Sequence, residues 1–419
     1  MSTASAAIGA PRKAVFGTGI VGLLALALFI NYIDRGNLST AAPLIKDELK
    51  VSATQMGLLL SIFFWGYTPG MIFAGWLQER INAYRTLALG LALWSLATIL
   101  SGVATGFVML IVLRLLLGLG ESVFFPCSSK LLGQHLPQNR MGAANALICV
   151  GLAIGPAFGT YAGGNIMAAV GWRWLFLLFG IGSALWLVPW LMATRNLSSE
   201  SNAPAADDGA APSFLAILSR RELWGVSIGH FCLNYGFYFI LTWLPTYLIK
   251  ARHLSVQDMA ALGGLIYLAQ GLSTMAAGYG SDWWMRRGAT SNLVRKTVSI
   301  GSSLLMAAGF GLAVTDNTTL TITGLFLAAT GVGANAPTLY AIGQTLAGPR
   351  ASGKWMSVQN ALGNCAGVVA PLVTGWLLDL TGGFTSTFGL ACGAAVVGAF
   401  SFGVVVRKIQ TLSWADQKA

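Results

Sequence analysis

The chain has 419 residues, of which 55% are hydrophobic and only 9% are charged, and its formal net charge is +11. A soluble core does not need this share of apolar side chains, and 52 glycines with 21 phenylalanines are typical of membrane-spanning helices. The composition therefore excludes an ordinary soluble protein and indicates a polytopic membrane protein.

Windows of about 20 mainly apolar residues, which are long enough to cross a bilayer as helices, recur along the whole chain. We place them at 14–37, 55–77, 84–104, 107–129, 142–165, 172–194, 222–248, 258–281, 295–314, 318–343, 355–377 and 384–407. The short polar tail before the first segment does not make it a cleaved signal, because that segment is too long. The predicted fold class is an all-α membrane protein with twelve transmembrane helices.

One stretch interrupts the apolar rhythm. The middle of 195–221 reads NLSSESNAPAADDGAAPS, which is small, polar and contains proline. We interpret 195–221 as a linker between an N-terminal six-helix bundle, 1–194, and a C-terminal six-helix bundle, 222–419.

The two predicted bundles echo each other. GWLQER at 75–80 corresponds to GYGSDW at 278–283, and Gly155–Pro156 corresponds to Ala370–Pro371. Weak similarity between halves is typical of transporters built from repeats, whose binding site lies where the repeats meet.

The basic residues predict an orientation. If the N-terminus is cytoplasmic, eighteen Lys and Arg residues fall on the cytoplasmic side and five on the other. This distribution follows the positive-inside rule, so both termini should be cytoplasmic. The net charge then reflects topology and gives no reason to expect a nucleic-acid partner.

Four charged residues interrupt the apolar segments: Asp34, Arg35, Arg114 and Glu121. A charge at membrane depth costs about 2.5 to more than 10 kcal/mol, so such residues usually border a cavity and mark a substrate or ion path. Arg114 and Glu121 are seven residues apart, which places them on nearly the same helix face, about 10 Å apart along the axis.

Asp34 and Arg35 are adjacent, and their side chains therefore leave a helix about 100° apart. Either both border a wide polar surface or the helix is broken, and the following Gly36 and Asn37 favour a break. A guanidinium can bind a carboxylate as a planar fork but stays protonated, whereas Asp34 and Glu121 can carry a coupling proton. A static ion-pair lattice between the two segments is the structural alternative.

Neutral polar side chains at membrane depth suit a polyhydroxylated substrate, although hydrogen bonds between helices explain them equally well. They are Tyr32, Tyr67, Asn234, Tyr235, Tyr238, Gln270, Gln359, Asn360 and Asn364. The five cysteines, at 127, 149, 232, 365 and 392, show no paired or metal-binding spacing, and we expect them to be buried small apolar side chains.

Five segments are informative when taken together: NYIDRGNLSTAAP (31–43), SATQMGLLLSIFFWGY (52–67), RLLLGLGESVFFP (114–126), GPAFGTYAGG (155–164) and SVQNALGNCAGVVAPLVTGWLLD (357–379). With these segments the chain resembles the major facilitator superfamily and, within it, the anion:cation symporters that carry sugar acids.

The resemblance implies roles for individual residues. It assigns Arg35 to the substrate carboxylate and Asp34 with Glu121 to proton binding, while Arg114 pairs with the acids. Tyr32, Tyr67 and Asn360 are the preferred polar contacts, with Gln270, Asn234 and Tyr238 as further candidates.

The superfamily's loop pattern Gly-x-Leu-x-Asp-Arg-x-Gly-Arg appears here with Glu79 in place of Asp and Asn82 in place of the second Gly. Glu79, Arg80 and, in the second half, Asp282 are therefore candidate gating residues. Asn82 in place of glycine puts the geometry of the local turn in doubt.

The sequence thus predicts a proton-coupled symporter that imports a small organic anion, a hexonate, hexuronate or aldarate, by alternating access. An exchanger or exporter of the same fold, and a carrier of aromatic or dicarboxylic acids, stay open. A receptor or membrane enzyme would need a signalling domain or a nucleophile with a base, and neither is visible. No nucleotide motif or metal site occurs, so we expect no enzyme activity and no cofactor beyond the proton. We expect a monomer in a bacterial inner membrane.

Overall fold

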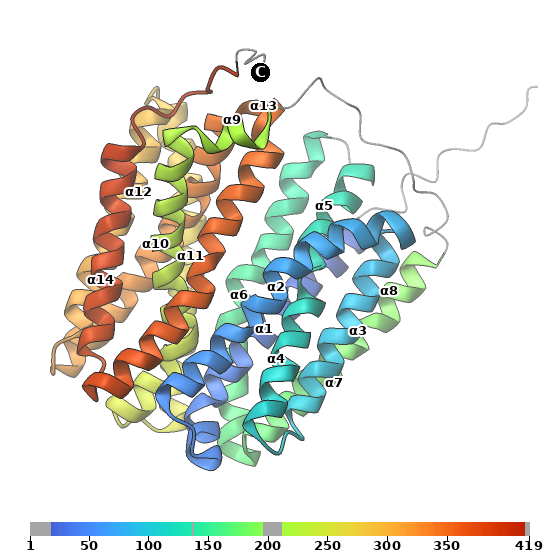
Figure 1. Ribbon diagram of the computed structural model, residues 1–419, viewed down its shortest axis with the longest axis vertical. Helices are drawn as coiled ribbons and strands as arrows, with labels where there is room; N and C mark the ends of the chain where they lie inside the picture. Colours follow the sequence, from blue (N-terminus) through green and yellow to red (C-terminus); the bar gives the residue numbers. More distant parts are fainter. Residues whose placement is uncertain (1–17, 136–137, 196–211, 415–419) are drawn as a thin grey trace, which may run out of the picture.

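The computed structural model describes residues 18–135, 138–195 and 212–414, and these residues form helices and no β-strand. Figure 1 shows two helix bundles side by side, one drawn in blue to green and the other in yellow-green to red. The first half contains α1 (Thr18–Leu49), α2 (Ala53–Ile81), α3 (Ala83–Ser101), α4 (Phe107–Glu121), α5 (Phe124–His135), α6 (Gln138–Val170), α7 (Trp172–Leu185) and α8 (Leu187–Thr194).

The second half contains helices α9 to α14 and two π-helical turns, η2 and η3. They are α9 (Phe214–Leu218), α10 (Arg221–Thr246), η2 (Tyr247–Ala251), α11 (Val256–Arg286), α12 (Ser291–Ala313), α13 (Thr318–Thr381), α14 (Thr385–Phe400) and η3 (Ser401–Val405). Residues 196–211 of the predicted linker lie outside the described residues, and its end contains the short helix α9.

The prediction of an all-α membrane architecture is confirmed, with differences in detail. Predicted segments 107–129 and 172–194 are each two consecutive helices, α4 with α5 and α7 with α8. Predicted segments 318–343 and 355–377 form α13, a single run that turns sharply at Gly348, whose φ of 66° is a conformation that glycine adopts without strain.

Ten helices in the described part of the chain are long and apolar enough to span a membrane, so the predicted count of twelve is confirmed only in part. The predicted segments 142–165 and 222–248 are the long helices α6 and α10, which are not among these ten. In α10, polar and aromatic residues such as Asn234 and Tyr238 lower the hydropathy. Most of α10 is buried against other helices, so protein surrounds it in place of lipid.

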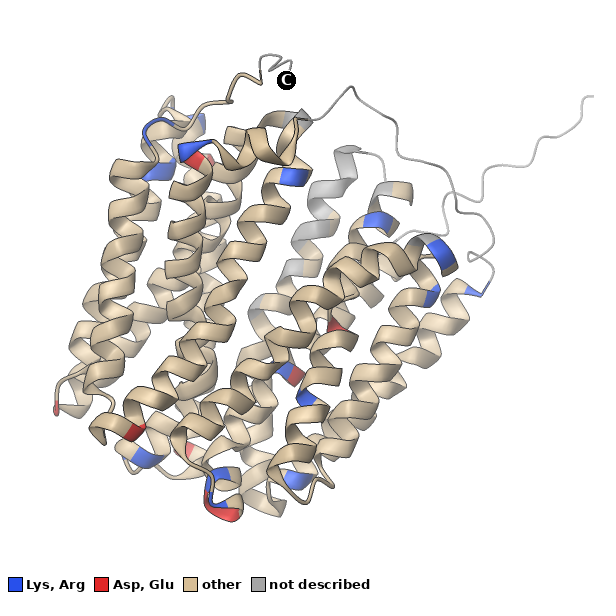
Figure 2. Cartoon of the chain, viewed as in Figure 1, with Lys and Arg blue, Asp and Glu red and all other residues tan. Residues whose placement is uncertain are grey.

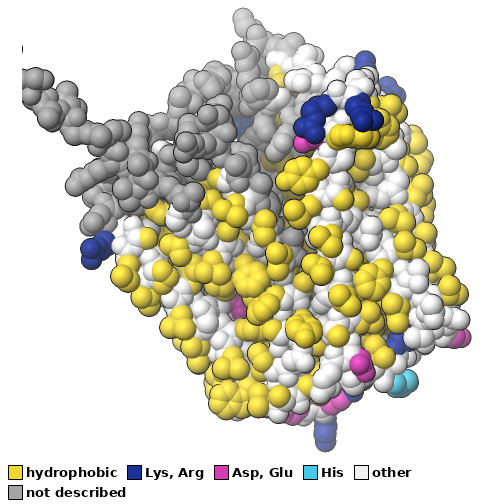
Figure 3. Space-filling model, turned by 180° about the vertical axis from the view of Figure 1, so that it is seen from behind, with side chains coloured by type: hydrophobic (Ala, Val, Ile, Leu, Met, Phe, Trp, Pro, Cys, Tyr) yellow, Lys and Arg dark blue, Asp and Glu magenta, His cyan; other side chains and the backbone are white. Residues whose placement is uncertain are grey.

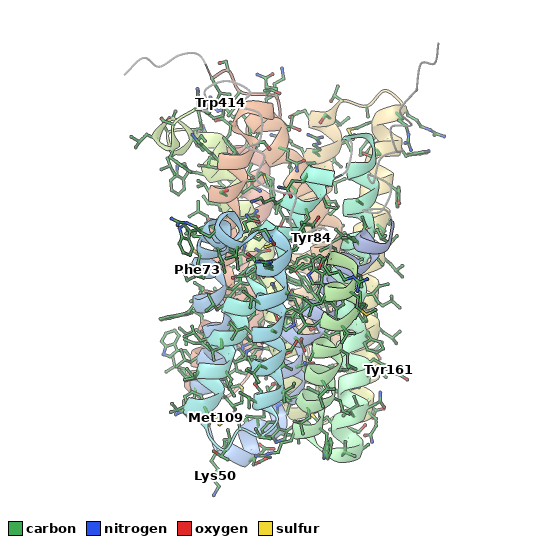
Figure 4. The ribbon with its side chains drawn as sticks, turned by 90° about the vertical axis from the view of Figure 1, so that its right-hand side faces the viewer. Lys50, Phe73, Tyr84, Met109, Tyr161 and Trp414 are labelled. Atoms are coloured by element: carbon green, nitrogen blue, oxygen red, sulfur yellow. The ribbon has the colours of Figure 1, made fainter. Side chains whose placement is uncertain are left out.

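The molecule has two distinct ends, which we name for what they carry. The terminal end holds the last described residues, near Trp414, and the loop end holds the turn at Lys50; Figure 4 shows these two residues at opposite ends of the bundle. Lys and Arg gather mostly at the terminal end, as Figure 2 shows.

The halves meet closely at the loop end. Gly57 of α2 lies so near α13 that an added Cβ would overlap the Pro371 carbonyl oxygen, and Gly375 of α13 stands in the same relation to the Ala53 carbonyl of α2. Figure 1 shows the two bundles converging toward the loop end and separating toward the terminal end. Backbone contact of this kind needs small residues on the facing helices.

Polar contacts reinforce the loop end. The Asp379 carboxylate of α13 accepts the backbone N–H groups of Ala53 and Thr54, at 3.0 and 2.7 Å, in the first turn of α2. Lys250 of η2 also forms an ion pair with Asp47 of α1. Both contacts join one half to the other.

The surface facing outward along the helices is largely apolar, as Figure 3 shows for one side of the molecule. Tryptophan, leucine and valine side chains such as Trp65, Leu185 and Val108 are exposed on the described helices, which fits contact with lipid. The prediction of buried cysteines holds for Cys127 and Cys232 and is wrong for Cys365, which is exposed, and for the half-buried Cys392. The side chain of Cys149 lies outside the described ones.

Candidate functional site

Helix α1 carries two of the four membrane-depth charges and runs without interruption from Thr18 to Leu49. The predicted break at Gly36 and Asn37 is therefore wrong. The side chains of Asp34 and Arg35 leave the helix in different directions, and each finds a different partner. Asp34 contacts α7, while Arg35 contacts α4. An intact α1 thus presents an acid and a base to different helices.

Arg35 forms a buried ion pair with Glu121. The Arg35 Nε donates to Glu121 Oε2 at 2.8 Å, and the two side chains are 5% and 0% exposed. The pair joins α1 to α4 in the middle of the first helix bundle. Figure 2 shows a small group of acidic and basic positions there, far from the other charges. A buried pair of this kind is stable only while both partners are present, because removing one leaves an uncompensated charge.

Aromatic rings surround the Arg35 guanidinium. Its central carbon lies 4.5 Å from the ring centroid of Tyr67, 4.8 Å from that of Tyr32 and 5.0 Å from that of Phe63. Such contacts stabilise a cation through the negative face of each ring. The Arg35 Nη2 is buried and donates no hydrogen bond within the described residues, so the cluster leaves one edge of the fork unused.

Asp34 has no cationic partner within 4 Å among the described side chains. Its carboxylate accepts a hydrogen bond from Asn37 Nδ2 at 2.9 Å and another from Ser183 Oγ at 2.9 Å. Asp34 is only 1% exposed. The two neutral donors therefore provide the polar environment of this buried carboxyl group.

Arg114 lies in the same region and forms no ion pair within 4 Å among the described residues. Its guanidinium carbon is 5.3 Å from the centroid of Phe63, the ring that also contacts Arg35. No acid lies within 4 Å of Arg114 in the described structure, where Glu121 is paired with Arg35, so the pairing of Arg114 with the acids stays a prediction. The buried Arg114 Nε has no hydrogen-bond partner among the described atoms.

Phe64 connects this cluster to the second half. Its ring contacts Tyr238 of α10 edge-on, with centroids 4.6 Å apart, and packs against Gly367 of α13, where any side chain would overlap the ring. The Tyr238 hydroxyl donates to Asn364 Oδ1 at 2.7 Å. Tyr238 therefore lies between the charge cluster and the polar residues of α13.

The other predicted contacts of the second half divide into two groups. Asn234 Nδ2 donates to the Gly363 carbonyl at 3.1 Å, which ties α10 to α13 as expected for an interhelical hydrogen bond. Asn360 Oδ1 and Gln270 Oε1 are buried and accept no hydrogen bond from the described residues. No described hydrogen bond joins Asn360 or Gln270 to Arg35.

The predicted gating residues lie at the terminal end. The Arg80 guanidinium stacks 5.4 Å from the Trp76 ring centroid, and Asp282 is exposed near the end of α11. The side chain of Glu79 lies outside the described ones. The described contacts do not bring Arg80 and Asp282 to the charge cluster.

Two residues of the cluster have no assigned role in the sequence pattern. Phe63 belongs to an aromatic run whose members are ordinarily core or lipid-facing, and only the fold places its ring beside both arginines. Ser183 stands in an apolar segment, where serine usually bonds its own helix, and nothing in the spacing links it to Asp34, 149 positions away.

Comparisons with known proteins show the family of this chain. The family model described as Major Facilitator Superfamily matches residues 24–351. The hexuronate transporter of Bacillus subtilis (strain 168) is 30% identical over 404 residues, which cover 93% of this chain and 94% of that protein. The probable galactarate/D-glucarate transporter of the same organism is 26% identical over 427 residues, covering 95% and 94%.

A solved structure has a similar fold. It is a bacterial homologue of the human lysosomal transporter Spinster in an inward-facing and unoccupied conformation. The TM-score is 0.72 at 19% sequence identity, and the match covers 95% of each chain.

Proposed function

Because the chain belongs to the major facilitator superfamily, and is therefore a transporter and not an enzyme, we propose that it imports a sugar acid together with protons by alternating access. The substrate class comprises hexonates, hexuronates and aldarates. The protein works as a monomer in a bacterial inner membrane, with both termini in the cytoplasm.

The observation that carries the proposal is the buried pair between Arg35 and Glu121. A guanidinium held by a carboxylate can accept a second carboxylate in its place. The unused Arg35 Nη2 already offers a donor for an incoming anion. The rings of Tyr32, Phe63 and Tyr67 hold the guanidinium in position during the exchange.

Charge balance links this exchange to a proton. If the substrate carboxylate replaced an ionised Glu121 on Arg35, two buried anions would face one another, at a large cost. Protonation of Glu121 removes that repulsion and releases Arg35 to the substrate. Asp34 is the second proton acceptor, because it is also buried and lacks a cationic partner within 4 Å in the described structure.

The relatives support the choice of sugar acids. The two curated relatives are named for a hexuronate and for galactarate and D-glucarate. Tyr238, Asn360 and Gln270 of the second half offer hydroxyl and amide groups that suit a polyhydroxylated chain. Arg114, which has no acid at ion-pair distance in the described part of the chain, is the natural partner of the second carboxylate of an aldarate.

Closure at the loop end supports alternating access. The glycine contacts, the Asp379 cap and the Asp47–Lys250 ion pair all join the halves at that end. Access to the charge cluster is then from the terminal end, which we assign to the cytoplasm. The opposite state requires these loop-end contacts to separate as one bundle rocks against the other.

The test is uptake of labelled acids by purified protein in proteoliposomes, with and without an inward proton gradient. The panel contains a hexonate, a hexuronate, an aldarate and an aromatic acid. We expect accumulation of a sugar acid that collapses when a protonophore is added. Uptake that ignores the gradient, or that needs an anion inside the vesicle, would overturn proton symport in favour of facilitated diffusion or exchange. Asp34 and Glu121 would then be structural partners within the bundle.

A further inference from the structure

We propose that Ser183 is a positioning residue for Asp34, exchanging the role of hydrogen-bond donor for that of acceptor when Asp34 takes up a proton. The inference rests on the proposed function, in which Asp34 binds a coupling proton. It adds a residue on α7, a helix with no other assigned part in coupling.

The geometry begins with a hydroxyl that has two acceptors in reach. Ser183 Oγ lies 2.9 Å from Asp34 Oδ2 and 2.9 Å from the Phe179 carbonyl oxygen of its own helix. A serine hydroxyl has one hydrogen and can donate a full hydrogen bond to only one of the two at a time. Ser183 is 2% exposed, so water does not compete freely for either.

Each protonation state of Asp34 has a satisfied arrangement. When Asp34 is ionised, Ser183 donates to Oδ2 and Asn37 Nδ2 donates to Oδ1. When Asp34 is protonated on Oδ2, its new O–H donates to Ser183 Oγ, and the Ser183 hydrogen turns to the Phe179 carbonyl at the distance already present. The Asn37 bond to Oδ1 is kept, since that oxygen still accepts.

The exchange moves one proton and leaves the remaining contacts unchanged. Asp34 gains one proton, and Ser183 keeps its own hydrogen throughout. In an apolar interior a carboxyl group that lacks a partner in one state is costly in that state. Ser183 therefore lets a buried acid change charge without leaving a polar atom unpaired.

Other charges act on Asp34 but do not replace Ser183. Glu121 and Arg114 of α4 are the charged side chains facing Asp34 from neighbouring helices in the described structure, and Arg35 adjoins it on α1. None of them hydrogen-bonds Asp34. On α7, the described contact with Asp34 is the Ser183 hydroxyl.

The experiment measures substrate exchange in proteoliposomes at equal pH on both sides, over a pH series, for the wild type and Ser183→Ala. A hydrogen bond to an ionised group is roughly twice as strong as one to a neutral group. Ser183→Ala therefore destabilises the ionised form of Asp34 more than its protonated form. We expect the pH profile of this variant to move toward alkaline pH by about 0.5–1 unit. Ser183→Thr keeps the hydroxyl and should restore the wild-type profile.

Ser101→Ala is the matched control. Ser101 is buried in α3 of the same half and donates to the carbonyl four residues earlier, at 2.8 Å, as Ser183 does. Its hydrogen bond to the Ala97 carbonyl involves no carboxylate. We expect an unshifted profile for this variant.

A wild-type pH profile in Ser183→Ala would overturn the inference, as would equal shifts in Ser183→Ala and Ser101→Ala. If Ser183→Ala does not fold, the test is made in an Asp34→Asn background, where residue 34 no longer takes up a proton. Adding Ser183→Thr or Ser183→Cys to that protein should leave its pH profile unchanged. A shift of the profile in either double variant would contradict the inference. Absence of gradient-driven uptake in the wild-type protein would instead overturn the proposed function. Failure of the proposed function is therefore distinguishable from failure of the role of Ser183.

Discussion

The Asp379 carboxylate of the second half accepts the backbone N–H of Thr54 in the first half at 2.7 Å. It also accepts the Ala53 N–H at 3.0 Å, while Ser52 and Gln55 form a capping box on the same turn. A helix N-terminus has four backbone donors without intrahelical partners, and its dipole favours an anion. One half of the molecule thus completes the cap of a helix in the other half.

Asp379→Asn should weaken loop-end closure, because an amide has a single acceptor oxygen and no charge. The contact is partly exposed, so we expect a loss of roughly 1 kcal/mol, or about a five-fold shift in population toward the state open at the loop end. Pulsed EPR between labels at Lys50 and Gln257, which are exposed on opposite halves near this end, measures the shift.

Asp258→Asn is the control for that measurement. Asp258 occupies the first turn of α11 and bonds Ser255 within the same half. Equal distance distributions for Asp379→Asn and the wild type would show that the cap does not hold the two halves together.

Arg35→Ala should abolish binding of the sugar acid, since the substrate carboxylate loses its guanidinium and Glu121 loses its partner. Truncating one member of a buried charge pair costs about 2–5 kcal/mol, so affinity should fall by about 30-fold or more. Arg35→Lys keeps the charge but not the fork and should bind with intermediate affinity. Equilibrium binding to purified protein checks this, with the exposed Arg287→Ala as control; wild-type affinity in Arg35→Ala would remove Arg35 from the site.

Glu121→Gln should keep substrate binding and lose proton-driven accumulation, because glutamine resembles the protonated acid and cannot exchange a proton. Binding should also become less sensitive to alkaline pH, since Arg35 is no longer held by an anion. Uptake with a proton gradient and exchange without one separate the two effects. Retained concentrative uptake would contradict the role of Glu121.

Asp34→Asn should resemble Glu121→Gln if the two acids share proton binding. Its buried hydrogen bonds to Asn37 and Ser183 make it sensitive to the change from carboxylate to amide. The pH dependence of exchange is the measurement, and a normal profile would remove Asp34 from the coupling mechanism.

Gly57→Ala should prevent full closure at the loop end, because the new methyl group would overlap the Pro371 carbonyl oxygen of the other half. We expect transport to fall at least ten-fold while the protein stays folded, since each bundle keeps its own contacts. Gly301→Ala is the matched control, as no described atom lies within 4 Å of its added Cβ. Comparable loss of uptake and thermal stability in both variants would contradict the closure argument.

Much of the fold follows from apolar runs of bilayer length, and the four charges are conspicuous because their segments are otherwise apolar. Local composition predicts helix continuity poorly where packing against other helices determines it. Gly36 and Asn37 favoured a break in α1, yet the helix is continuous, because buried contacts on its faces override weak local preferences. Polar residues such as Asn234 likewise obscure α10 in the sequence, a helix that is mostly buried against other helices.

Pairing within the site could not be read from spacing. Arg114 and Glu121 share a helix face, which suggests that they act together. In the structure, Glu121 forms its ion pair with Arg35, which lies on another helix. Ser183 gave no signal at all, because a serine in an apolar segment looks the same whether it bonds its own helix or a distant carboxylate. Such choices depend on how helices are rotated and juxtaposed, which a single sequence does not encode locally.

Two of the ion pairs that α1 forms with other elements, Lys250–Asp47 and Arg35–Glu121, differ in their contact with water, and dissolved salt should therefore distinguish them. Lys250 and Asp47 are 40% and 57% exposed at the side chain, against 5% and 0% for Arg35 and Glu121. Mobile ions screen exposed charges over a Debye length of about 8 Å at physiological ionic strength, but reach a buried pair poorly. Raising the ionic strength should thus weaken closure at the loop end while the electrostatics of the substrate site stay nearly constant.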